Sequence, residues 1–209
     1  MPDPKAIVRH GYDEIACAYL AARGNDTDDV RLLDDLLGRL PVGARVLDAG
    51  CGAGEPVTRI LSQHCDVTGL DISHVQLDIA RSAIPNAAFV QGDLTALPFV
   101  DATFDALVSY FALIHVPLAQ HATALRELRR VLRPGGLALF SMGANDNPVD
   151  IDPNWLGAGT PMYWSHYGRA DNLRLVAEAG FCLIWERLIA EDAEFGGGEH
   201  LFVLAESES

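Results

Sequence analysis

Short apolar runs and amphipathic segments alternate along most of the chain. A short apolar run is typical of a strand that is buried on both faces of a sheet, and apolar positions three or four residues apart are typical of a helix. Strands are predicted at Val46-Leu47 and over residues 66–71, 87–91, 104–110 and 137–141. Helices are predicted over residues 5–22, 27–39, 55–63, 73–83, 122–132 and 172–179, with Thr27 and Ser73 as N-caps.

The pattern changes near the carboxyl end of the chain. Residues 181–190 and 199–204 predict two strands with only a glycine turn at 196–198 between them, so we expect an antiparallel hairpin at the sheet edge. Residues 142–168 contain three prolines and several glycines and are predicted to be a long irregular loop. This loop would lie over the carboxyl end of the sheet, where ligands bind in α/β proteins, and we interpret it as a substrate lid.

Composition excludes several classes of protein. The chain has 209 residues with 49% hydrophobic content, which suits one globular domain, and its formal net charge of -14 argues against a nucleic-acid surface. No apolar stretch is long enough to span a membrane and no signal peptide is evident, so we expect a cytoplasmic protein. The four cysteines are Cys17, Cys51, Cys65 and Cys182. None of them form a C-x-x-C pair, so no metal site is expected.

The stretch 44–56 carries the most specific signal. Its three alternating glycines, Gly50, Gly52 and Gly54, lie between the first apolar run and the start of a helical pattern, and they predict a tight turn where a ligand approaches bare backbone. The spacing G-x-G-x-G is one residue shorter than the dinucleotide fingerprint G-x-G-x-x-G. Asp48 at the strand end would repel a pyrophosphate but would suit a cationic ligand.

The sequence Asp-x-Gly-x-Gly-x-Gly from Asp48 resembles the signature of class I S-adenosylmethionine (SAM)-dependent methyltransferases. Gly92-Asp93 with Leu-Pro-Phe behind it, and Leu-Arg-Arg-Val-Leu-Arg-Pro-Gly-Gly over 128–136, match the same family. The resemblance is tight over residues 40–141 and looser elsewhere. It implies one α/β domain over 1–209, with helices of residues 1–40 as a cap. The sheet would be Rossmann-like and doubly wound, with seven strands in the order 3-2-1-4-5-7-6 and the last strand antiparallel.

The resemblance implies SAM as the cofactor and S-adenosylhomocysteine as its product. Asp71 ends the second predicted strand, where a carboxylate accepts hydrogen bonds from ribose hydroxyls, although it could also cap the following helix. Asp93 would accept from the adenine N6 amine, with Leu94 on the adenine face. The predicted cofactor-binding residues are Tyr19, Asp48, Gly50, Cys51, Gly52, Asp71, Ile72, Asp93, Leu94, Tyr110 and Phe111.

Two histidines are candidates for a general base. His115 follows the fourth predicted strand and could take a proton from a hydroxyl nucleophile, but it could equally pack against or cap the next helix. His166 is the second candidate. Aromatic residues of the amino-terminal helix and of the 142–168 loop are predicted to line the substrate pocket, unless the tryptophans are core residues. The predicted substrate-binding residues are Tyr12, His115, Trp155, Tyr163 and Trp164.

These features together predict a methyltransferase acting on a nitrogen or oxygen nucleophile of a small molecule. A protein or RNA methyltransferase would need a recognition domain or a basic face, and a SAM-binding protein without methyl transfer remains an alternative. The glycine spacing, Asp48 and the terminal hairpin disfavour a nicotinamide dehydrogenase. The expected partner is a small-molecule acceptor, with no nucleic acid and no membrane, and the chain is expected to be a monomer or a homodimer.

Overall fold

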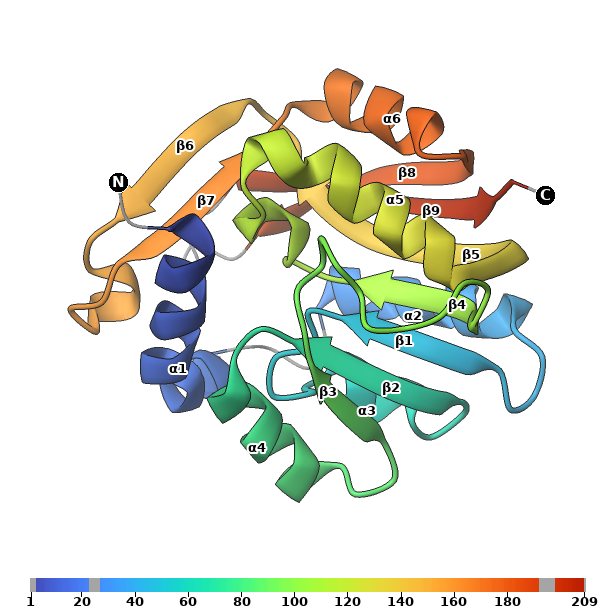
Figure 1. The fold of residues 1–209 in the computed structure, drawn as a ribbon, viewed down its shortest axis with the longest axis horizontal. Helices are drawn as coiled ribbons and strands as arrows, with labels where there is room; N and C mark the ends of the chain where they lie inside the picture. The colour runs from blue at the N-terminus through green and yellow to red at the C-terminus, as the bar shows by residue number, and fades with distance from the viewer. Residues whose placement is uncertain (1–2, 23–26, 192–197, 209) are drawn as a thin grey trace.

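A seven-stranded sheet forms the centre of the computed structural model, which describes residues 3–22, 27–191 and 198–208 (Figure 1). Strand β9 runs antiparallel to both β5 and β8, and the other neighbouring strands are parallel. In sheet order the strands are β3 (Ala88–Gln91), β2 (Asp66–Asp71), β1 (Arg45–Ala49), β4 (Phe104–Ser109), β5 (Leu132–Gly143), β9 (Gly198–Ser207) and β8 (Phe181–Glu191). The predicted order 3-2-1-4-5-7-6 is confirmed, because β8 and β9 are the sixth and seventh strands of this sheet.

Helices cover both faces of the sheet. Helices α2 and α3 pack on one face, and α5 and α6 pack on the other. Val46 and Leu47 of β1 are fully buried in these two separate cores, which confirms that this strand is buried on both faces. The helices are α1 (Pro4–Ala22), α2 (Asp28–Arg39), α3 (Val57–Leu61), α4 (His74–Ala83), α5 (His121–Val131), α6 (Arg169–Glu178) and the short 3-10 helices η1 (Leu113–His115), η2 (Leu118–Gln120) and η3 (Trp155–Gly157).

Helix α1 lies beyond the arrowheads of the central strands instead of on a face of the sheet (Figure 1). Beside it, β6 (Asn147–Asp152) and β7 (Met162–His166) pair as a separate antiparallel sheet. The prediction of an irregular loop over 142–168 is therefore wrong. Proline does not prevent this pairing, because Pro148 lies where the register shifts between β6 and β7.

The β6–β7 hairpin packs closely against α1. Gly11 makes this approach possible, since a Cβ atom there would lie 3.0 Å from the Pro161 carbonyl oxygen. The buried apolar residues shared by α1, η3 and β7 are Val8, Ile15, Trp155, Met162 and Tyr163. The segment that is predicted to be a substrate lid thus contains a hairpin that packs against the cap helix. Its role toward a substrate stays a prediction.

Local signals at helix ends were informative to different degrees. Ser73 is the N-cap of α4 as predicted, and its hydroxyl accepts from the Gln76 N–H at 3.1 Å. Thr27 is the N-cap residue of α2 but makes no capping hydrogen bond through its side chain. Helix α3 is shorter than predicted. Of the predicted 196–198 turn, residues 196 and 197 lie outside the described part of the chain.

Within the described ranges, none of the helices combines the length and the apolar character that crossing a bilayer requires.

Candidate functional site

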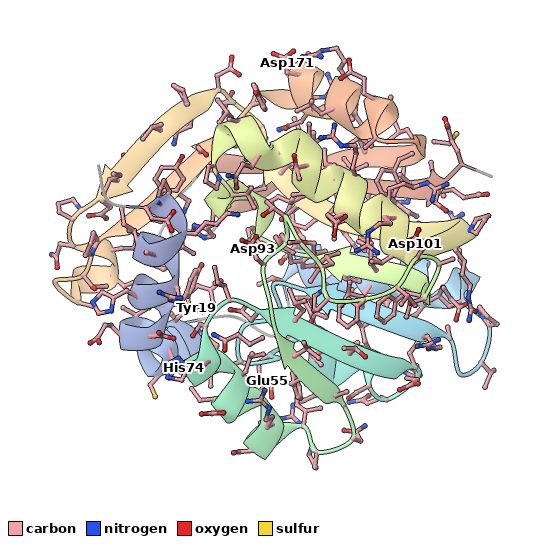
Figure 2. All side chains as sticks on the ribbon, viewed as in Figure 1. Tyr19, Glu55, His74, Asp93, Asp101 and Asp171 are labelled. Carbon is pink, nitrogen blue, oxygen red and sulfur yellow. The ribbon has the colours of Figure 1, made fainter. Side chains whose placement is uncertain are left out.

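A cavity lies at the carboxyl ends of β1, β2, β3 and β4, and residues of α1 line it as well. Every residue predicted to bind the cofactor lines this cavity. All of them except Tyr19 of α1 lie at the ends of β1 to β4 or just after these strands, which meet at one edge of the sheet. Figure 2 shows Tyr19 of α1 and Asp93 beyond β3 near this edge, whereas Asp101 and Asp171 lie away from it. Their individual roles toward the cofactor stay predictions.

The N–H groups of the glycine turn after β1 donate to oxygen atoms of the protein itself. Gly50 and Cys51 donate to the Leu70 carbonyl oxygen at 2.7 and 2.9 Å, Gly52 donates to Asp71 Oδ2 at 2.8 Å, and Gly54 donates to the Cys51 carbonyl oxygen at 2.9 Å. A dinucleotide-binding turn instead points such donors at a phosphate. These four donors are already satisfied, so the turn suits a ligand without a phosphate.

Two buried carboxyl groups flank this turn. Asp48 is 2% exposed and accepts a 2.5 Å hydrogen bond from Thr58 Oγ1, and burial raises its pKa to about 7. Burial also raises the pKa of Asp71, although N–H donors from Ser73 and Gly52 oppose the rise. A cation in the cavity would favour the ionised form of both groups. The site therefore fits the sulfonium and ammonium groups of SAM.

The raised pKa of Asp48 predicts how the stability of the cofactor-free protein depends on pH. The unfolded chain releases this proton near pH 4 and the folded chain near pH 7, so stability falls as the pH rises through 7. Between pH 6 and 8 this single group should lower the free energy of unfolding by about 1.4 kcal/mol. We expect Asp48→Asn, which cannot ionise, to lack this part of the decrease when urea unfolding is compared at the two pH values.

Thr58→Val is a useful companion variant, since it removes the hydroxyl that stabilises the Asp48 carboxylate and should steepen the decrease. Equal pH slopes in wild type and Asp48→Asn would show that Asp48 is ionised over the whole range.

Asp93, the predicted adenine contact, has a partner that sequence reasoning missed. Lys5 of α1 donates from Nζ to Asp93 Oδ2 at 2.7 Å, and Thr95 donates to Oδ1 through its N–H and its hydroxyl. Burial acts to raise the pKa of Asp93, but these hydrogen bonds outweigh it and hold the pKa below its usual range. An ionised carboxylate has about four lone-pair sites, so Asp93 can still accept from an amine.

His115 is held at both ring nitrogens. Its Nδ1 lies 2.8 Å from the Tyr163 carbonyl oxygen and its Nε2 lies 2.9 Å from Tyr12 Oη. Burial lowers its pKa to about 4, so the ring is neutral near pH 7. Both His115 and Tyr12 line the cavity. His115 is therefore packed into its surroundings, which is one of the two roles that the sequence predicted for it. Any proton transfer by His115 would have to pass through the hydrogen bond between its Nε2 and the Tyr12 hydroxyl.

The remaining predicted substrate residues do not line this cavity. Trp155 is 8% exposed and packs edge-on against Tyr12 and Trp164, with ring centroids 5.7 and 5.3 Å apart. Trp155 contacts the Tyr12 ring and Trp164 contacts the His115 ring, each with ring centroids 5.7 Å apart, so these tryptophans pack against two residues that line the cavity.

Tyr163 is buried, and its backbone carbonyl oxygen lies 2.8 Å from His115 Nδ1. His166, the second candidate base, does not line the cavity either, and its Nδ1 lies 2.7 Å from the Asn145 carbonyl oxygen.

Other cavity residues were not singled out from the sequence. They lie near the same strand ends, at the start of α3 or on α1, and they are Lys5, Val8, Leu20, Ala53, Glu55, Pro56, Val57, Leu70, Gly92, Ala112 and Val116. Most of them could have been predicted because they lie beside a predicted site residue in the sequence. Lys5 could not, because one lysine at the start of an amphipathic helix does not indicate its distant partner.

Comparison with known proteins adds an independent line of support. A family model described as a methyltransferase domain matches residues 46–136. The chain is 39% identical over 127 residues to malonyl-[acyl-carrier protein] O-methyltransferase of Enterobacter lignolyticus, covering 60% of this chain and 50% of that protein. It is 32% identical over 201 residues to a protein of Encephalitozoon cuniculi named as a methyltransferase, covering 87% and 91%.

Solved structures agree in fold. A SAM-dependent methyltransferase from Methanosarcina mazei superposes with a TM-score of 0.74 at 21% identity, covering 83% of this chain and 97% of that one. The chain spans about half the length of the first curated relatives that it matches.

Proposed function

The chain belongs to the family of SAM-dependent methyltransferases, and we propose that it transfers the methyl group of SAM to a nitrogen or oxygen nucleophile of a small molecule. The observation that carries this proposal is the glycine turn, whose N–H groups are bonded internally beside two buried acids. That chemistry suits a cationic cofactor without a phosphate. The name of the Enterobacter relative, an O-methyltransferase, supports an oxygen nucleophile.

SAM supplies a methyl group that is activated by positively charged sulfur. In the proposed complex Asp71 accepts hydrogen bonds from the ribose and Asp93 accepts from the adenine amine, while the segment after β4 holds the methionine part. The acceptor enters beside Tyr12 and His115. Holding both reactants in line supplies much of the rate, since effective molarity contributes about 7–11 kcal/mol. A base is needed only for a nucleophile that keeps its proton at neutral pH, and His115 is the candidate inside the cavity.

Calorimetric titration of the purified protein with SAM, S-adenosylhomocysteine and NAD tests the cofactor class directly. We expect the first two to bind and NAD not to bind. Tight binding of NAD without binding of SAM would overturn the proposal. A screen of small hydroxyl and amine compounds with methyl-labelled SAM then tests the acceptor class, and transfer of label only to protein or RNA would contradict it.

A further inference from the structure

The charged side chains that line the cavity are mostly acidic. They are the carboxyl groups of Asp48, Glu55, Asp71 and Asp93, and the amine of Lys5. Lys5 is the only lysine or arginine among the described residues that line the cavity, and its Nζ already donates to Asp93 Oδ2 at 2.7 Å and to Thr95 Oγ1 at 2.6 Å. Asp48 accepts from a neutral hydroxyl and Asp71 accepts from backbone N–H groups. An anionic ligand would therefore meet negative charge in this cavity, and its one lysine is already paired with an acid.

The cavity has an apolar part around Tyr12. Val8, Tyr12 and Leu20 lie four and eight residues apart on α1, so their side chains share one face of the helix, and all of them line the cavity. The Tyr12 and His115 rings have centroids 5.3 Å apart, and Val116 beside His115 lines the cavity as well. The carboxyl groups instead lie at or after the ends of β1, β2 and β3. The part around Tyr12 thus suits an uncharged, largely apolar ligand.

The hydrogen bonds of His115 fix the direction of the Tyr12 hydroxyl. A carbonyl oxygen can only accept, so the Nδ1 atom that lies 2.8 Å from the Tyr163 carbonyl oxygen carries the proton. The buried ring is neutral, so its Nε2 accepts the proton of the Tyr12 hydroxyl, 2.9 Å away. The Tyr12 oxygen can then only accept hydrogen bonds from a ligand. A hydroxyl group can donate to it, whereas a carboxylate or a fully ionised phosphate cannot.

We propose that the methyl acceptor is an uncharged compound whose hydroxyl group is attached to an unsaturated carbon, as in a phenol, and donates to Tyr12, and that carboxylates and phosphates are excluded. This inference rests on the proposed function. An anionic acceptor would lie among like charges and would have no proton to give to Tyr12. An alcohol meets both conditions, but His115 is a weak base because burial lowers its pKa to about 4, and a phenol gives up its proton more readily than an alcohol.

The proposed step balances without a further reactant. The bond between the acceptor oxygen and the methyl carbon forms as the bond between that carbon and sulfur breaks, and sulfur keeps the electron pair. The hydroxyl proton passes to the Tyr12 oxygen while the Tyr12 proton passes to His115 Nε2. Tyr12 thus contacts the acceptor, and His115 acts through Tyr12.

The test of the acceptor class uses matched compounds on benzene and naphthalene rings. Each ring carries a hydroxyl, a hydroxymethyl, a carboxylate or a methoxy group. Calorimetry on the complex with S-adenosylhomocysteine should show that naphthol binds at least about tenfold more tightly than ionised naphthoic acid, because like charges in contact oppose binding. With methyl-labelled SAM, the phenols should accept label faster than the alcohols, and the carboxylates should accept none. Tighter binding or faster labelling of the carboxylates, faster labelling of the alcohols, or no binding of either phenol would overturn the proposal.

Tyr12→Phe tests the hydrogen bond itself. We expect it to weaken naphthol binding by about three- to tenfold and to leave methoxynaphthalene within about twofold, since the methoxy group has no proton to donate. Tyr167→Phe is the matched control, because Tyr167 packs against His121 and does not line the cavity, and it should change neither constant. Equal losses for both compounds, or no loss for naphthol, would contradict the proposed contact.

Nitrogen NMR of His115 provides a readout that needs no ligand. We expect the Nδ1–H tautomer in wild type at pH 7, and a changed Nε2 shift in Tyr12→Phe. An Nε2–H tautomer in wild type would overturn the proposal, because the Tyr12 hydroxyl could then donate to an anion. Failure of the proposed function is distinguishable, since wild type would then bind no SAM and label none of the compounds.

Discussion

Gly50→Ala should lower the free energy of unfolding by about 3 kcal/mol or more and abolish measurable SAM binding. Gly50 has a φ of 88°, where a side chain costs about 1–2 kcal/mol. The new Cβ would also fall far inside van der Waals distance of the Ala112 Cβ. Ala112 cannot rotate away, because its Cβ is attached directly to backbone, and overpacking of this kind costs a further 1–3 kcal/mol, roughly. Urea unfolding and calorimetric titration measure the two effects.

Gly43→Ala is the matched control for this substitution. Gly43 has a φ of 73°, and no atom lies within 4 Å of a Cβ built there. This variant should therefore show the backbone strain alone, about 1 kcal/mol, with SAM affinity unchanged. Equal losses of stability in the two variants would mean that the segment after β4 yields to the added methyl group, and that the close approach of Gly50 to Ala112 is not a requirement of the site.

The segments that follow β1, β2, β3 and β4 could be placed in the cavity from sequence because their positions depend on local patterns. A buried apolar run identifies each strand, and parallel strands bring their carboxyl ends to one edge of the sheet. Asp71 ends one predicted strand and Asp93 follows another, so both could be placed at the cavity without any knowledge of distant contacts. Glycine spacing adds the turn geometry, since Gly50, Gly52 and Gly54 all adopt positive φ.

The contacts of α1 could not be predicted in the same way. Lys5 and Asp93 are 88 positions apart, and Tyr12 and His115 are 103 apart, so no local pattern links them. An amphipathic helix shows that it buries one face but not against which partner. The prediction of an irregular loop over residues 142–168 is wrong for a related reason. Its prolines and glycines suggested a loop, while the pairing of β6 with β7 depends on packing against a helix far away in sequence.

Asp71→Ala should weaken SAM binding by about 1.5–3 kcal/mol, which raises the dissociation constant by about tenfold or more. The carboxylate accepts from the N–H groups of Gly52 and Ser73, both at 2.8 Å, so it holds the glycine turn and the start of α4 while facing the cavity. Losing a hydrogen bond to a charged acceptor costs about 1.5–3 kcal/mol. Calorimetry with SAM measures the loss, and circular dichroism checks that the variant is folded.

Two further variants separate binding from structure at this position. Asp71→Asn keeps the size of the side chain and one acceptor oxygen, so it should preserve most of the stability and still bind SAM more weakly than wild type. Asp171→Ala removes an exposed carboxylate from α6, away from the cavity, and should leave the affinity unchanged (Figure 2). If folded Asp71→Ala bound SAM as tightly as wild type, Asp71 would serve only to join the glycine turn to α4, and the ribose would have to be held by other residues of the cavity.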